Sequence, residues 1–175
     1  MAIRDFDNFL PDIHPSCFID DKALVLGQVT MGENCSVWPF TVIRGDVNSI
    51  TIGNNTNIQD NSVLHVSHDG PYNPGGYNLE IGDDVTIGHR VILHGCHIGN
   101  LCLVGMGSTI MDGVVIESNT IIGAGSLVTP NKKLESGFLW MGSPARKVRK
   151  LTGTELESLK YSAQHYVKLK NRHQL

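Results

Sequence analysis

Aliphatic side chains recur at every sixth position along most of this chain. The period runs from residue 13 to residue 128, with one shift of three residues, one long insertion and one step of five. Glycine or a polar residue usually follows the aliphatic position, and the fifth residue of each hexad is usually small or β-branched. The eighteen aliphatic positions are Ile13, Ile19, Val25, Met31, Val37, Ile43, Ile52, Ile58, Leu64, Ile81, Ile87, Leu93, Ile98, Val104, Ile110, Ile116, Ile122 and Val128.

A period of six predicts an all-β solenoid. Each hexad supplies one short strand and one tight corner, so three hexads, or about eighteen residues, make one triangular coil. The aliphatic residue points into a thin core, and the coils stack about 4.8 Å apart, the spacing of neighbouring strands. The pattern therefore predicts about six coils. A content of 19 glycines and only 6% aromatic residues suits such a narrow, turn-rich core.

The chain divides into three segments around this solenoid. They are an N-terminal lead-in at 1–12, the solenoid at 13–142 with an insertion loop at 66–79, and a linker with a C-terminal α-helix at 143–175. Thr154 and Glu157 have the spacing of a capping box, and apolar residues after them share one helical face. The helix is therefore expected at about 154–172.

Composition and charge exclude several classes of function. The formal net charge of −3 indicates neither a nucleic acid nor an anionic membrane as partner. No apolar run approaches the roughly 18 residues of a membrane span, and no apolar leader begins the chain, so we expect a cytoplasmic protein. Its four cysteines are expected to be reduced. Cys17 and Cys35 share one inward slot of adjacent coils, which indicates core packing.

The hexad frame assigns the aliphatic residues to three faces of the coil, named a, b and c in rotation. On face c, three successive coils present Arg44, His65 and His94 directly after the aliphatic residue. These residues form a column whose neighbours lie about 4.8 Å apart. Two imidazoles at that spacing can share one metal ion, since Zn–N bonds are about 2.0–2.1 Å long.

His89 lies on face b, one coil above Asp60 in the same slot. Five residues of extended chain, roughly 16 Å, separate it from His94, which is too far for one metal within one subunit. In a three-fold trimer of triangular coils, face b of one chain abuts face c of its neighbour, so the three histidines would meet there. Three neutral histidines leave a fourth zinc position for water, the pattern of catalytic zinc. The alternative interpretation is that each is an ordinary surface or interface histidine.

Several short motifs resemble those of the γ-class carbonic anhydrases and their bacterial homologues, over nearly the whole chain. They are Arg44-Gly45-Asp46, Asn57-Ile58-Gln59-Asp60, His65, Gly88-His89, His94-Gly95-Cys96, Val104-Gly105-Met106-Gly107, Gly123-Ala124-Gly125-Ser126 and Gly142-Ser143-Pro144-Ala145. The resemblance implies a left-handed parallel β-helix and a homotrimer with metal sites at the subunit interfaces. It implies Zn²⁺, or alternatively Fe²⁺, held by His65, His89 and His94.

By the same resemblance the chain is an enzyme, a carbonic anhydrase-like lyase. Metal-bound hydroxide would convert CO₂ reversibly to bicarbonate. Gln59 would orient the hydroxide, and Asp60 would support the site. Arg44 and Asp46 would pair across or near the interface. Tyr166 would reach the pocket from the C-terminal helix.

The residues for proton transfer depart from the archaeal type of that family. Val47 stands where the archaeal type has a glutamate, and its acidic loop with a second glutamate is absent. His68, in the insertion, could replace them, because histidine exchanges protons near neutral pH; otherwise it hydrogen-bonds within its loop. We therefore expect weak or latent hydration. Two alternatives stay open: an acyltransferase or acyl-CoA thioesterase with a histidine as general base, and a non-catalytic metal-binding trimeric scaffold.

Overall fold

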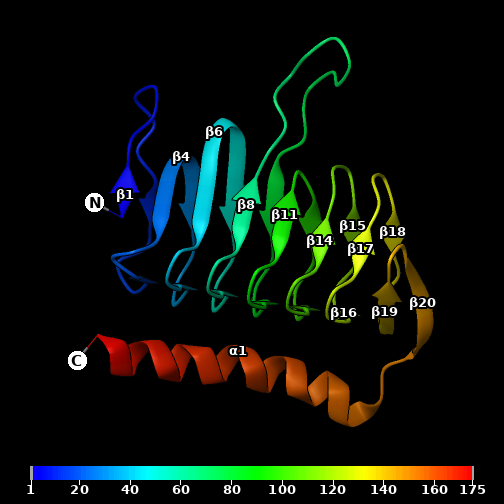
Figure 1. Cartoon of the computed structure of the whole chain (residues 1–175). Helices are drawn as coiled ribbons and strands as arrows, with labels where there is room; N and C mark the ends of the chain where they lie inside the picture. The colour runs from blue at the N-terminus through cyan, green and yellow to red at the C-terminus, as the bar shows by residue number, and fades with distance from the viewer. Residues whose placement is uncertain (1, 175) are drawn as a thin grey trace.

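The computed structural model describes residues 2–174, and within them the chain forms a left-handed parallel β-helix with one C-terminal α-helix (Figure 1). The strands stack as successive coils from the N-terminal to the C-terminal end. The helix α1 (Gly153–His173) runs back along the stack, so its end lies near the first coils. The fold class predicted from the six-residue period is confirmed.

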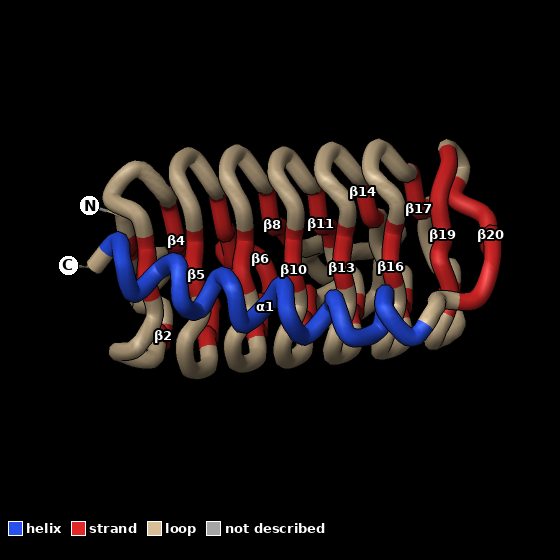
Figure 2. Tube along the Cα trace, turned by 90° about the horizontal axis from the view of Figure 1, so that it is seen from below, coloured by secondary structure: helices blue, strands red, loops and turns tan. Residues whose placement is uncertain are grey.

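Face b is a separate sheet, and α1 crosses its strands (Figure 2). Its strands pair in parallel except for the last two, which form an antiparallel hairpin. In order they are β3 (Phe18–Ile19), β5 (Ser36–Val37), β7 (Asn57–Ile58), β10 (Thr86–Ile87), β13 (Leu103–Val104), β16 (Ile121–Ile122), β19 (Phe138–Gly142) and β20 (Ala145–Lys150).

Faces a and c form one continuous sheet, because β4 (Leu24–Met31) and β6 (Val42–Ile52) bend from one face to the other. The shift of three in the sequence frame is the extra length of β6 at this bend. Face c continues with β8 (Val63–His65), β11 (Ile92–His94), β14 (Thr109–Ile110) and β17 (Leu127–Val128). Face a continues with β9 (Leu79–Ile81), β12 (His97–Ile98), β15 (Val115–Ile116) and β18 (Lys133–Leu134). β1 (Ile3–Arg4) and β2 (Asp12–Ile13) pair with β4.

The core consists of aliphatic stacks along the three faces. The predicted positions within Val25–Val128 are all at most 3% exposed. Ile13 and Ile19 are only partly buried, because the first coil has a neighbouring coil on one side. Leu134 and Trp140 continue the frame and add about one coil to the six that the sequence predicts.

The C-terminal end of the stack differs from the expected linker. Residues Ala145–Lys150 form β20, which returns beside β19. The ammonium of Lys147 lies 4.4 Å from the centre of the Phe138 ring. By pairing with β19, β20 covers backbone groups of that strand that would otherwise face solvent.

The cap of α1 lies two residues before the expected one. Thr152 and Glu155 form the capping box, whereas the sequence also offers Thr154 with Glu157. The earlier pair is favoured because Arg149, at the end of β20, makes two 2.8 Å bonds to the carboxylate of Glu155.

The inner side of α1 packs on face b. Leu159 and Ala163 are buried there, and the Ser162 hydroxyl lies 3.0 Å from that of Thr86. Within the described part of the chain, no helix has the length and apolar character that crossing a bilayer requires.

Replacing Leu134 by Ala should lower the free energy of unfolding by about 2–5 kcal/mol, because a fully buried leucine leaves an aliphatic stack. The matched control is Lys133→Ala on the same strand, which removes an exposed ion pair with Glu117 and should cost less than about 1 kcal/mol. Urea unfolding followed by circular dichroism measures both changes. Equal losses would contradict the extension of the core frame to residue 134.

Candidate metal centre

His65 and His94 lie side by side on face c. They end β8 and β11, whose register pairs the two residues directly. Leu64 and Leu93 before them are fully buried, so the alternation of a strand turns both histidines outward. The ring centres are 5.1 Å apart, and Nδ1 of His65 faces Nε2 of His94 at 3.1 Å.

Each ring uses its other nitrogen for a carboxylate. Nε2 of His65 lies 3.0 Å from Oδ1 of Asp46, and Nδ1 of His94 lies 2.7 Å from Oδ1 of Asp112. The second oxygen of Asp46 pairs with Arg44 of the same chain. An ionised carboxylate only accepts hydrogen bonds, so a neutral ring carries its proton on the carboxylate side. The two nitrogens that face each other are then both acceptors, and a proton or a cation between them is required to relieve their repulsion.

The geometry of this pair fits a metal ion. Two nitrogens bound to one tetrahedral zinc at about 2.0–2.1 Å are about 3.3 Å apart, close to the 3.1 Å between His65 and His94. Metal-binding histidines usually donate their second nitrogen to a carboxylate or carbonyl, which fixes the tautomer. Within residues 2–174 of a single chain, no group of three or more His, Cys, Asp or Glu side chains could hold a metal.

The local electrostatics favour a neutral imidazole beside an ionised carboxylate. Burial lowers the pKa of His65; the hydrogen bond to Asp46 opposes this, and the charge of Arg44 reinforces it. For Asp46, burial acts to raise the pKa, but hydrogen bonds from Arg44 and His65 outweigh it and the net pKa lies below its ordinary value. Neutral histidine is the form that binds metal ions.

Asp112 is a residue of this site that the six-residue frame did not reveal. Its Oδ2 accepts a 3.0 Å hydrogen bond from the hydroxyl of Ser67, at the start of the insertion. Nδ2 of Asn48 donates in turn to the carbonyl oxygen of Ser67 at 3.1 Å. Its position in the sequence could have revealed it. Asp112 comes two residues after Ile110, and Ile110 pairs with Leu93, the residue before His94.

His89 belongs to a second cluster, on face b. Its Nδ1 lies 2.8 Å from Oδ2 of Asp60, which again leaves Nε2 as an acceptor. Tyr166, on α1, has a raised pKa because of burial and then because of the Asp60 charge. Gln59 is buried, and its Nε2 donates to Oδ1 of Asn57 at 3.1 Å.

The nine site residues predicted from the sequence therefore fall in two clusters and a loop. The face c cluster contains Arg44, Asp46, His65 and His94, and the face b cluster contains Asp60, His89 and Tyr166, with Gln59 directly before Asp60 in the chain. His68 is exposed in the insertion, which projects away from the stack between β8 and β9 (Figure 1). Among the described residues, no hydrogen bond or ion pair joins the two clusters, or His68 to either of them.

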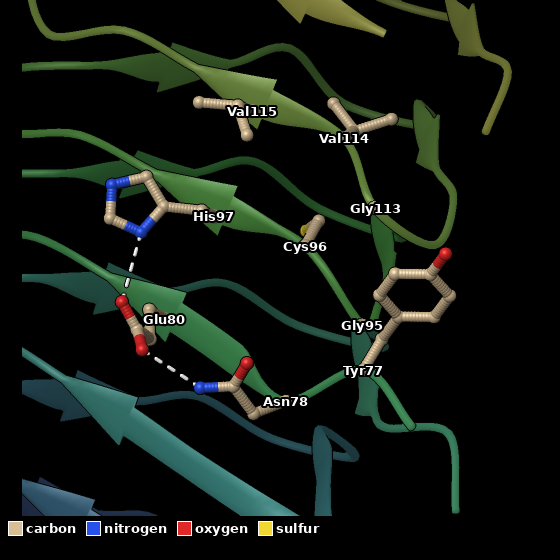
Figure 3. A pocket seen from close by; sticks show the side chains of 9 residues that line it. All are labelled: Tyr77, Asn78, Glu80, Gly95, Cys96, His97, Gly113, Val114 and Val115. Carbon is tan, nitrogen blue, oxygen red and sulfur yellow. Dashed lines mark hydrogen bonds and ion pairs between the residues drawn. The ribbon is translucent and has the colours of Figure 1, made fainter. Parts of the chain in front are cut away.

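An open pocket lies close to the end of the insertion, on the side of face a (Figure 3). Glu80 joins His97 at 3.0 Å and Asn78 at 2.8 Å there. Cys96, in its wall, is buried, and burial raises the pKa of its thiol. The described residues that line this pocket include none of the nine predicted site residues.

Comparison with known proteins places this geometry in a family. Residues 95–130 match the family described as "Bacterial transferase hexapeptide (six repeats)". "Protein YrdA" of Escherichia coli K12 is 50% identical over 172 residues, which covers 98% of this chain and 94% of the relative. "Gamma carbonic anhydrase 2, mitochondrial" of Arabidopsis thaliana is 42% identical over 165 residues, or 93% of this chain and 58% of the relative. The chain belongs to the γ-carbonic-anhydrase-like hexapeptide-repeat family.

Solved structures similar to this γ-carbonic-anhydrase-like chain include one named for another activity. A putative acetyltransferase from Bacillus cereus is 41% identical and superposes with a TM-score of 0.90, over 98% of this chain and 95% of that one. Relatives with closely similar sequences thus carry names from two classes of enzyme. Membership of the family does not decide which reaction is catalysed, so the reaction has to be argued from the side chains of the site.

In this γ-carbonic-anhydrase-like chain, Asp112→Asn should weaken zinc binding by about 10–100-fold, because His94 loses the carboxylate that fixes its tautomer. Glu80→Gln is the matched control, since it alters an equivalent pair with His97 outside both clusters and should leave affinity unchanged. Competition with a chromophoric chelator measures both. Equal affinities for Asp112→Asn and the unmodified protein would contradict this role of Asp112.

Proposed function

We propose that this chain is a metal-dependent carbonic anhydrase that interconverts CO₂ and bicarbonate, with weak or latent activity. It would act as a homotrimer in which His65 and His94 of one chain and His89 of the next hold Zn²⁺ or, alternatively, Fe²⁺. The observation that carries this proposal is the 3.1 Å contact between Nδ1 of His65 and Nε2 of His94, which are both acceptors when each neutral ring donates to its ionised carboxylate. A shared cation removes the repulsion between them.

The division of the histidines between two faces supports the trimer. His89 carries its own carboxylate and presents its free nitrogen from face b, whereas the other two histidines lie on face c. Val63 and Ile92, which precede Leu64 and Leu93 on face c, expose 40% and 44% of their surface. Apolar side chains next to a polar site suit burial against a second subunit.

A bound metal supplies a Lewis acid that lowers the pKa of coordinated water toward about 7, and so provides a nucleophile for CO₂. Asp46, Asp112 and Asp60 orient the three imidazoles and fix which ring nitrogen faces the metal. Because Gln59 donates through Nε2 to Asn57, its Oε1 is the end available to accept a hydrogen bond from the reacting water and so orient it.

Other residues would bind the product anion and release the proton. Arg44, paired with Asp46, sets a positive charge beside the histidine pair, which suits the bicarbonate anion. Val47, in the corner after Arg44, has no proton to exchange. We assign proton transfer to His68, whose loop is exposed to solvent. A single relay residue on a projecting loop is consistent with slow turnover.

Acyl transfer is the second candidate, because a relative of 41% identity is named a putative acetyltransferase. In that reaction one histidine would act as a general base, and a metal would not be needed. A general base needs only one histidine, whereas this chain has three histidines that each contact a carboxylate through one ring nitrogen. Metal dependence therefore separates the two candidates.

Protein purified without chelator should contain about one zinc or iron per chain. His89→Ala and His94→Ala should each abolish metal binding while the circular dichroism of the solenoid is retained. Co-expressed in equal amounts, the two variants should restore about a quarter of the sites, because each mixed trimer keeps one interface with all three histidines. Elemental analysis of the purified mixture measures this. A mixture of trimers without metal would contradict sharing between subunits.

Stopped-flow CO₂ hydration on the zinc- and iron-loaded protein tests the reaction itself. The rate should exceed that of the chelator-treated protein and should be lost in His94→Ala, because that change removes a ligand. His97→Ala, on the neighbouring face a, is the matched control and should keep full activity. An acyl-CoA hydrolysis panel runs in parallel. Acyl-CoA turnover that survives metal removal, without any CO₂ hydration, would favour the second candidate.

A further inference from the structure

Two thiols stack in register at the N-terminal end of the solenoid. Cys17 and Cys35 directly precede β3 and β5, and the amide of Phe18 donates to the carbonyl oxygen of Cys35 at 2.9 Å. Residues paired in this way have Cα atoms about 4.8 Å apart. This separation lies within the roughly 4.4–6.8 Å that a disulfide spans. Both cysteines are free.

The two thiols differ in access to solvent. Cys35 is fully buried between the first and third coils. Cys17 is partly exposed, because the first coil has a neighbouring coil on one side. Cys96 and Cys102, elsewhere in the stack, are buried. Among the described cysteines, a small oxidant in solution therefore reaches Cys17 first.

A buried cation lies next to Cys17. Lys170, in the last turn of α1, is only 2% exposed. Its Nζ donates to the carbonyl oxygen of Ser16 at 2.9 Å and to Oδ1 of Asn171 at 2.7 Å. Nε2 of Gln174 donates to the carbonyl oxygen of Cys17 at 3.3 Å. The end of α1 therefore holds the ammonium group of Lys170 near Cys17, the more accessible of the two thiols.

These surroundings favour the thiolate at one cysteine. The neighbouring Cys35 thiol and the charge of Lys170, acting against burial, lower the pKa of Cys17 to about 7. In its protonated form the Cys17 thiol donates to the carbonyl oxygen of Gly32 at 3.0 Å. Burial raises the pKa of Cys102 to about 12. The pKa of Cys35 is raised as well, by its interaction with Cys17 and by burial. A thiol whose pKa is near ambient pH is the best nucleophile of such a set.

We infer that Cys17 is a peroxide-reactive thiol and that Cys35 is its resolving partner, so that oxidation links the first two coils by a reversible disulfide. The inference does not depend on the proposed metal chemistry. Core packing, the interpretation from the sequence, accounts for Cys35 but not for an accessible Cys17 beside a buried ammonium.

The two steps balance with a hydroperoxide as oxidant. The Cys17 thiolate attacks one oxygen of H₂O₂, the O–O bond breaks, and with one proton the products are the Cys17 sulfenic acid and water. The Cys35 thiol then attacks the Cys17 sulfur, a second water leaves, and an S–S bond forms. An external dithiol reverses the sequence by two thiol–disulfide exchanges.

The test treats the reduced full-length chain with a small excess of H₂O₂, in buffer without added transition metal. Intact mass should fall by two hydrogens per chain, and peptide mapping should find a Cys17–Cys35 linkage that dithiothreitol removes. Alkylation by iodoacetamide at neutral pH should be at least about tenfold faster at Cys17 than at Cys102. Cys35→Ser should accumulate a sulfenic acid at Cys17 that a dimedone probe traps.

The variants are designed to fold. The thiol of Cys35 donates a hydrogen bond to the carbonyl oxygen of Gly53 at 2.8 Å. The hydroxyl of Thr56, in the same slot of the next coil, makes the equivalent bond to the carbonyl oxygen of Gly82 at 2.9 Å. A hydroxyl is thus already accommodated in this stack. Cys102→Ser is the matched control and should oxidise like the unmodified chain. Equal alkylation rates at Cys17 and Cys102, or disulfides only between chains, would overturn the inference even if the Cys35→Ser variant were unstable.

Discussion

The spacing of stacked parallel strands, about 4.8 Å, is the constraint on which the rest of this structure depends. A single coil cannot bury its aliphatic residues, so neighbouring coils have to stack in register. Because the strands stack in register, residues that are far apart in sequence come to lie side by side on one face. His65 and His94 are 29 residues apart in sequence, and the pairing of β8 with β11 brings their rings together. The core therefore specifies where the outward side chains lie, because those side chains follow buried leucines directly.

The same constraint places groups together that repel each other. When each neutral imidazole donates to its ionised carboxylate, Asp46 or Asp112, two nitrogen lone pairs face each other at 3.1 Å. A proton shared between the rings is one solution, but burial lowers the pKa of His65 and opposes it. The proposed metal ion is the other solution, and it would use both lone pairs as ligands. The carboxylates thus orient the two rings so that both lone pairs would face the proposed metal.

Periodicity predicts those features that depend on register alone. The faces, the buried positions and the pairing of the two histidines on face c all follow from counting in sixes. Features at corners and ends do not, because a period of six says nothing about loop conformation. Asp112 reaches back to the preceding coil from a corner, and Ser67 approaches it from the insertion. The cap of α1 at Thr152 depends on Arg149 of a strand that the period does not contain.

Two stacked pairs of side chains follow from one stacking rule, and α1 links the coil that carries the thiols to the face b cluster. The imidazoles point outward in the middle of the stack, and the thiols lie in an inward slot at its open end. Lys170 ties the last turn of α1 to the first coil, one helical turn after Tyr166, which lies near Asp60. Because a helix is stiff over one turn, the position of Tyr166 depends on that attachment. The face b cluster is therefore supported by the end of the solenoid that carries the thiols, as well as by the coils that carry its own residues.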